Sequence, residues 1–260
     1  MSFQFNVGIR YYQFEHLGDG LSQAVFTRRG GLSPEPWAAL NLGGSVGDDP
    51  ERVRANRQRA LAALERDSES VYDVWQVHGV NVVITEAARR REQPQLQADA
   101  ILTNTPGITL LMRFADCVPV LLHDPVRKVI GIVHAGWKGS VCTTVRVAVE
   151  TMQARFGSSP ADIRAGIGPS IGPDHYEVGP DVVIKVRQAF GQNAYRLLKE
   201  RKGSTYFDLW AANRLILEQA GVKEIELAGL CTACHTDDWY SHRAEHGRTG
   251  RFGALIALTA

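Results

Sequence analysis

Several features of large protein classes are missing from this chain of 260 residues. No apolar run approaches the roughly 18 to 20 residues of a membrane-spanning helix. No internal repeat of short period and no low-complexity segment occurs, which excludes solenoids and long flexible linkers. The first residues form neither a basic region nor a sustained apolar stretch, so no secretory signal is visible. We therefore expect a folded cytoplasmic protein.

The net charge is also small, and cysteines are few. The formal net charge of +1 at pH 7 gives no broad attraction to nucleic acid or to an acidic membrane surface. The four cysteines, in a chain without a secretory signal, are expected to be thiols and not a disulfide framework. The expected partners are therefore small molecules, with no nucleic acid and no membrane, and the composition carries no signal of an oligomeric state.

Strand and helix signals alternate along the whole chain. Glycine and proline recur throughout instead of collecting at one boundary, which favours a single interwoven domain over residues 1–260. Helices are expected after the N-caps Asp49 and Asp208 and at Pro180, and a fourth over 141–156. The predicted strands are 24–27, 71–75, 80–85, 108–113, 118–123, 129–134, 163–167, 224–230 and 252–258. This mixture predicts an α/β fold with mixed sheets and central hairpins, not a doubly wound one.

Three side chains with metal-binding or nucleophilic chemistry follow apolar runs and precede turn residues. They are Cys117, His134 and His78, in Ala115-Asp116-Cys117, His134-Ala135-Gly136-Trp137-Lys138-Gly139 and Gln76-Val77-His78-Gly79. Each alone is more often a buried thiol or a strand-end histidine. Asp116 would be costly to bury without a partner, and Pro119 suits a strand end or edge. A helix expected after Gly136 would add an anion-binding N-terminus.

Two chemistries remain open for these three residues. Ligands of type His, Cys and His leave one tetrahedral position free, which is the catalytic arrangement of zinc sites. Zinc in such a site lowers the pKa of a bound water to about 7. The metal-free rival is a Cys117 nucleophile activated by His134 and steadied by Asp116.

Other motifs carry weaker signals. Cys231-Thr232-Ala233-Cys234-His235 matches a haem-attachment pattern, which we reject because no export signal is present. Pairing its cysteines with His242 and His246 as structural zinc leaves too short a spacing, so two inert thiols are the favoured interpretation. Residues 166–172 follow a strand and predict a ligand-lining turn, because Pro169 is incompatible with a dinucleotide fingerprint. Most arginines are expected on the solvated surface, Arg57 among them.

Arg243 and Arg251 bracket a Gly-Arg-Thr-Gly turn. Guanidinium groups match phosphate oxygens in geometry and charge, so this turn is a candidate anion cradle.

Taken in order, these motifs resemble those of the family once called multicopper polyphenol oxidases or laccase-domain proteins. Its members are described as purine nucleoside phosphorylases with adenosine deaminase activity, and some as peptidoglycan editing factors. The resemblance covers nearly the whole chain. The motifs that carry it, besides those around His78, Cys117 and His134, are Thr27-Arg28-Arg29-Gly30-Gly31, Leu40-Asn41-Leu42-Gly43, Val46-Gly47-Asp48-Asp49-Pro50, Asn56-Arg57, Ala98-Asp99-Ala100, Ile167-Gly168-Pro169, Tyr176-Glu177-Val178-Gly179, Ser241-His242-Arg243 and Thr249-Gly250-Arg251.

The resemblance implies a mixed α/β core in roughly four α/β/β/α layers and a metal site at His78, Cys117 and His134 that holds Zn²⁺ or Cu²⁺. It implies phosphorolysis of adenosine, inosine, guanosine or methylthioadenosine to base and ribose 1-phosphate, with deamination of adenosine. The predicted substrate-binding residues are Asn41, Lys138, Arg243 and Arg251. Departures from the family pattern are Phe114, Lys138 and His175.

Three alternatives remain beside the nucleoside enzyme. One is an amidase or cysteine-type hydrolase that edits muropeptide precursors. The second is a non-enzymatic binding protein whose metal merely orders the fold. The third, a copper-dependent polyphenol oxidase, fits poorly, because a blue-copper centre plus a trinuclear cluster needs more histidines than the eight present.

Overall fold

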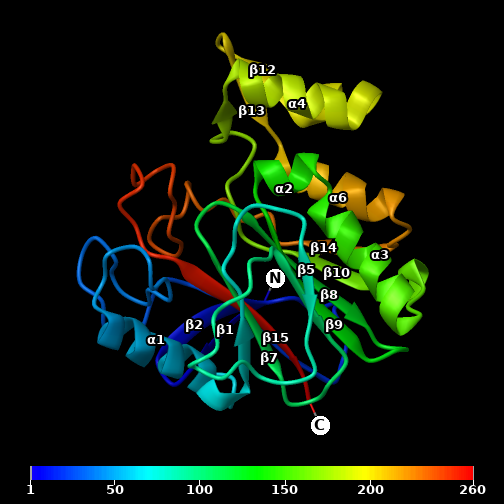
Figure 1. The fold of residues 1–260 in the computed structure, drawn as a ribbon. Helices are drawn as coiled ribbons and strands as arrows, with labels where there is room; N and C mark the ends of the chain where they lie inside the picture. The colour runs from blue at the N-terminus through cyan, green and yellow to red at the C-terminus, as the bar shows by residue number, and fades with distance from the viewer. Residues whose placement is uncertain (1, 260) are drawn as a thin grey trace.

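Two six-stranded mixed sheets form the centre of the computed structural model, which describes residues 2–259 (Figure 1). The strands of the first sheet, in spatial order, are β1 (Ser2–Asn6), β2 (Ile9–Gln13), β3 (Leu21–Phe26), β15 (Phe252–Leu258), β7 (Thr109–Phe114) and β4 (Val71–Asp73). Those of the second are β14 (Glu224–Leu227), β10 (Arg164–Ile167), β8 (Val118–Asp124), β9 (Val129–Ala135), β6 (Ala100–Thr103) and β5 (Val82–Ile84). A small third sheet has the order β11 (Glu177–Val178), β13 (Ser204–Phe207) and β12 (Leu198–Arg201).

The helices lie outside the sheets. The α-helices are α1 (Pro50–Ala62), α2 (Trp137–Val141), α3 (Thr144–Phe156), α4 (Pro180–Phe190), α5 (Ala194–Leu197) and α6 (Leu209–Gln219), and the 3-10 turns are η1 (Ser68–Ser70), η2 (Pro160–Asp162) and η3 (Gly191–Asn193). Between residues 2 and 259, no helix has both the length and the apolar character that crossing a membrane requires.

Successive side chains of the central strands lie in different hydrophobic cores, which arranges the molecule in layers. In β9, Ile130 and Ile132 face the core between the two sheets, whereas Val129 and Val133 face the core under α3 and α6. In β15, Leu255 instead joins the core under α1. Because side chains in a strand alternate between its two faces, each sheet separates two cores. The expected mixed α/β class is confirmed, with α1 on one side of the paired sheets and α3 and α6 on the other (Figure 1).

Most predicted elements are present, with shifted ends. The side chain of Asp49 caps α1 and that of Asp208 caps α6, as their positions predicted. The helix predicted over 141–156 is confirmed as α3 with a later start, because α2 ends at Val141 and Thr143, with a φ of 58°, precedes the first residue of α3. The hairpin of β1 and β2 and the third sheet were not predicted.

Pro119 lies at a strand end, but not at a sheet edge. It is the second residue of β8, which lies between β10 and β9. The ladder with β10 ends at Val120, so the missing amide of Pro119 breaks no pairing on that side. Its carbonyl accepts a 2.8 Å hydrogen bond from the amide of Gly168.

Candidate functional site

His78, Cys117 and His134 converge from three separate segments. Cys117 lies between β7 and β8, His134 lies in β9, and His78 lies in the loop after β4. One ligand atom of each lies within 4.8 Å of those of the other two. His134 is buried, Cys117 is half-buried and His78 is exposed, so the group is open to solvent on one side.

Asp99 orients this group, a role that the sequence analysis did not assign to it. Its carboxylate lies 2.7 Å from Nδ1 of His134 and accepts hydrogen bonds from the amides of Val77, His78 and Gly79. The bond to Nδ1 leaves Nε2 of His134 free to face the other two side chains. A carboxylate behind a histidine is the usual partner of a metal-binding imidazole, because it fixes the ring and raises its basicity. The motif Ala98-Asp99-Ala100 was the available signal.

The charges of the group favour a thiolate. Burial alone would raise the pKa of the Cys117 thiol, but the charge of His134 and hydrogen bonds from both imidazoles lower it to about 6. Burial alone would lower the pKa of His134, yet the Cys117 thiolate and the Asp99 carboxylate raise it to about 9. Thiolates are both the nucleophilic and the metal-binding form of cysteine.

A glycine gives these side chains room. A Cβ atom added at Gly136 would lie 2.7 Å from Sγ of Cys117 and 3.3 Å from Cδ2 of His78. Any larger residue would therefore push the thiolate out of the group. Among residues 2–259, no fourth His, Cys, Asp or Glu joins these three. Two imidazoles and a thiolate with an open side are a donor set that fits a metal ion with a free coordination position.

Asp116 has a different role from the one expected. Its carboxylate accepts hydrogen bonds of 2.6 Å from the Thr232 hydroxyl and of 2.6 Å from the amide of Arg243, so the steadying of His134 falls to Asp99. Phe114 is buried behind the group, with its ring centroid 5.5 Å from that of His134.

A cavity of about 940 Å³ opens in front of the group. Its lining includes seven cationic side chains and one carboxylate, that of Asp116. The cationic residues are Arg57, Arg89, Arg91, Arg113, Lys138, Arg243 and Arg251. Aromatic side chains line it as well, namely Trp75, Trp137 and Tyr176. This excess of positive charge favours an anionic ligand, and the rings offer flat surfaces to a planar one.

Three of these arginines gather around one acid. Asp73 forms 2.8 Å ion pairs with Arg89 and with Arg113. Burial, together with the charge of Arg113, lowers the pKa of Arg57 to about 10. Arg57 was expected on the solvated surface, and Arg89 and Arg113 had no assigned role. No local sequence pattern indicates that these three arginines lie together, because their segments are far apart along the chain.

The predicted substrate-binding residues fall into two groups. Lys138, Arg243 and Arg251 line the cavity. The guanidinium of Arg243 lies 5.1 Å from the Tyr176 ring centroid, and burial lowers the pKa of Arg251. Asn41 is fully buried, and its Oδ1 accepts hydrogen bonds from the amides of Gly43 and Arg251. Asn41 therefore holds Arg251 in place from behind the cavity wall.

Other predicted motifs also have definite places. Ile171, from the expected ligand-lining turn, does line the cavity. His242 lines it too, and neither His242 nor His246 joins Cys231 and Cys234, so the finger-like pairing is wrong. These cysteines instead lie beside Asp174 and His175.

Known proteins are similar to this chain in sequence and in fold. A purine nucleoside phosphorylase of Deinococcus radiodurans is 43% identical over 235 residues, which cover 90% of this chain and 88% of that protein. The purine nucleoside phosphorylase YlmD of Bacillus subtilis is 36% identical over 240 residues, with coverages of 89% and 86%. The crystal structure of YlmD from Geobacillus stearothermophilus superposes with a TM-score of 0.93 at 32% identity and covers 99% of both chains.

The family assignment rests on a match along nearly the whole chain. Residues 22–259 match the family described as multi-copper polyphenol oxidoreductase laccase. That range contains His78, Cys117, His134 and every cationic residue of the cavity lining. The chain therefore belongs to the multi-copper polyphenol oxidoreductase laccase family.

Proposed function

We propose that this protein is a metal-dependent purine nucleoside phosphorylase. The observation that carries the proposal is the strongly cationic cavity in front of His78, Cys117 and His134. The names of the similar proteins from Deinococcus radiodurans and Bacillus subtilis support it. The substrates would be inorganic phosphate and a purine nucleoside such as adenosine, inosine, guanosine or methylthioadenosine.

The cationic residues would bind phosphate. Arg243 has one guanidinium nitrogen bonded to the carbonyl of Glu177 at 2.9 Å, which fixes its orientation over the Tyr176 ring. Lys138 and Arg251 also line the cavity and add positive charge. A phosphate held there would attack C1′ of the ribose as the bond from C1′ to N9 of the purine breaks, and the base would leave with the electron pair. Positioning and charge would supply most of the rate enhancement.

The purine would lie against the aromatic side chains. Trp75 is 50% exposed and lines the same cavity as Trp137, so both present ring surface to a planar base. His78, Cys117 and His134 would hold Zn²⁺ or Cu²⁺. When bound, that ion supplies Lewis-acid stabilisation of negative charge.

Purified metal-replete protein incubated with inosine and phosphate provides the test. Ribose 1-phosphate and hypoxanthine are the expected products. Arg243→Gln should raise KM for phosphate about 10- to 150-fold, because one charge-assisted hydrogen bond to an anion contributes about 1.5–3 kcal/mol. Arg54→Gln, an exposed arginine on α1, is the matched control and should leave KM unchanged. Absence of ribose 1-phosphate with every purine nucleoside would refute the proposal.

Deamination of adenosine is a second candidate for the same cavity. Two histidines and a cysteine resemble the ligands of zinc-dependent nucleobase deaminases. Those enzymes also use a glutamate as proton carrier, whereas the only carboxylate in this lining is Asp116, which already accepts two hydrogen bonds. Release of ammonia from adenosine in the absence of phosphate measures this activity separately.

A cysteine-type amidase is the metal-free alternative. This alternative is favoured because the thiolate of Cys117 contacts the imidazole of His134, which in turn contacts the carboxylate of Asp99. Cleavage of a nucleotide-linked muramoyl amino acid by chelator-treated protein, with nucleosides left intact, would establish this activity in place of phosphorolysis.

A further inference from the structure

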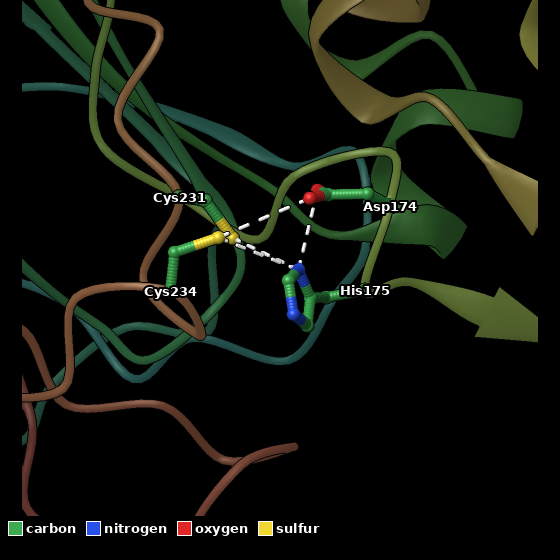
Figure 2. Close-up of side chains that lie close together, drawn as sticks. All are labelled: Asp174, His175, Cys231 and Cys234. Carbon is green, nitrogen blue, oxygen red and sulfur yellow. Dashed lines mark hydrogen bonds and ion pairs between the residues drawn. The ribbon is translucent and has the colours of Figure 1, made fainter.

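A second group of metal-type side chains lies in two loops (Figure 2). Asp174 and His175 lie between β10 and β11, whereas Cys231 and Cys234 follow β14. The four point toward one another, and one ligand atom of each lies within 4.8 Å of all the others. We propose that these four residues form a second metal site that takes a structural zinc-type cation.

The distances from Nδ1 of His175 to the other three side chains are close to those of a tetrahedral site. Zinc binds sulfur at about 2.3 Å and nitrogen or oxygen at about 2.0–2.1 Å, so a tetrahedron places sulfur about 3.5 Å from nitrogen or oxygen, and nitrogen about 3.3 Å from oxygen. Nδ1 of His175 lies 3.5 Å from Sγ of Cys234 and 3.8 Å from Sγ of Cys231. It lies 3.2 Å from Oδ1 of Asp174. Sγ of Cys234 lies 3.9 Å from the other Asp174 oxygen.

The backbone around this group is already arranged for it. An isolated bridge pairs Ser170 with Cys231, and the amide of Thr232 donates to the carbonyl of Ser170, so the two loops are fixed side by side. The amide of Gly172 donates to Sγ of Cys231 at 3.2 Å, which holds this sulfur in place from the other loop. A Cβ atom at Gly172 would lie 3.1 Å from both Cβ and Sγ of Cys231 in the other loop, so a glycine here lets the two loops approach closely.

Four protein ligands would make this site closed, unlike the three-ligand group in the cavity. Closed tetrahedral sites are structural, and open ones are catalytic. The residues next to two of the ligands explain what the cation would hold. Tyr176 follows His175 and lines the cavity, and Thr232 follows Cys231 and donates to Asp116 at 2.6 Å. The cation would therefore fix one wall of the cavity from outside.

Metal binding at this site is independent of the proposed phosphorylase activity, and it is tested by counting metal ions. Protein purified under reducing conditions is loaded with Co²⁺, desalted and analysed for cobalt per chain and for sulfur-to-cobalt charge-transfer absorption. Cys117→Ser removes the only thiolate of the first site, so the absorption that remains reports the second site. We expect it to persist in Cys117→Ser and to disappear when Cys231→Ser and Cys234→Ser are added, because neither group then holds a thiolate. Cys142→Ser, which removes an exposed cysteine outside both groups, is the matched control.

Exchanging one ligand for another type of ligand distinguishes the loss of metal coordination from a loss of folded structure. His175→Ala should lower the cobalt content by about one ion per chain, whereas His175→Cys should restore it, because both histidine and cysteine bind such cations. Circular dichroism confirms that each variant is folded. No thiolate–cobalt absorption in folded Cys117→Ser would overturn the proposal. A disulfide between Cys231 and Cys234 that persists under reducing conditions would also overturn it. Equal cobalt contents in the wild type and in His175→Ala would do the same.

Discussion

At the scale of single residues, Asp99 connects two parts of the group formed by His78, Cys117 and His134. Its one carboxylate holds the imidazole of His134 and the backbone of the His78 loop at the same time. His78 itself has a φ of 59°, a left-handed conformation that a non-glycine residue adopts only when neighbouring contacts enforce it. Three backbone hydrogen bonds to Asp99 provide that enforcement.

Asp99→Asn keeps the size of this side chain and removes its charge. We expect metal affinity at the first site to fall about 10–100-fold, the usual effect of losing the partner of a metal-binding histidine. Competition with a chromophoric chelator measures the affinity. Asp162→Asn, at an exposed carboxylate in η2, is the control and should leave affinity unchanged. Equal affinities in both variants would contradict the role given to Asp99.

The thiolate of Cys117 has its own pH signature. Because the pKa of Cys117 is lowered to about 6, its alkylation by iodoacetamide in chelator-treated protein should increase with pH around a midpoint near that value. Peptide mass spectrometry after timed quenching measures the rate. His134→Gln removes the neighbouring charge, and its midpoint should move to higher pH. A midpoint shared by both proteins would show that His134 does not stabilise the thiolate.

At the scale of elements, an ion-pair network joins β4 to β7 beneath the cavity. Asp73 at the end of β4 pairs with Arg113 of β7 and with Arg89 in the loop after β5, and the side chains of all three are at least 83% buried. The guanidinium of Arg113 also donates to the carbonyl of Val74. One acid therefore allows two cavity arginines to lie close together, and a third, Arg57, lies near enough for their charges to lower its pKa.

Asp73→Asn should destabilise the fold by about 3 kcal/mol, because removal of one partner leaves buried charges unpaired. Urea unfolding at pH 7, monitored by tryptophan fluorescence, measures the free energy. Glu51→Gln breaks the exposed pair with Arg54 on α1 and should have almost no effect. A similar loss of unfolding free energy in the two variants would mean that the buried Asp73 network stabilises the fold no more than an exposed ion pair does.

At the scale of the whole molecule, buried acids set the response to pH. The charges of Arg113 and Arg89 outweigh burial and lower the pKa of Asp73, and hydrogen bonds from His134 and from backbone amides do the same for Asp99. The unfolded chain binds protons to these acids at a higher pH than the folded chain does. Their contribution to stability is therefore complete above the unfolded pKa of about 4 and is lost as pH falls through the lower folded values.

The free energy of unfolding should consequently fall steeply below about pH 4. Urea titrations between neutral and acid pH measure the slope. Asp73→Asn lacks one of the two acids, so its stability should depend less on pH in that window. A slope identical to that of the wild type would show that Asp73 does not contribute to acid unfolding.

Much of this protein was predictable from local signals. Asp49 and Asp208 cap helices because their side chains satisfy free backbone amides, and the strands around Cys117 and His134 are continuous apolar runs. The turn residues near His78, Cys117 and His134 predicted that these side chains would share one site, and the structure brings their ligand atoms within 4.8 Å of one another. The break at Thr143 and the hairpin of β1 and β2 were missed, because tertiary packing decides them against weak local preferences.

The sequence by itself determined the fold class, the family and the three side chains that meet in the cavity, since these follow from periodicity, capping and motif order. Only the tertiary structure decided which charged groups support them. The carboxylate that contacts His134 is that of Asp99 and not that of Asp116. Asp73 pairs with two arginines from distant segments, and Asp174 and His175 lie beside two cysteines from another loop. Such partners are separated by tens of residues, and no local pattern encodes which distant segments a sheet will place side by side.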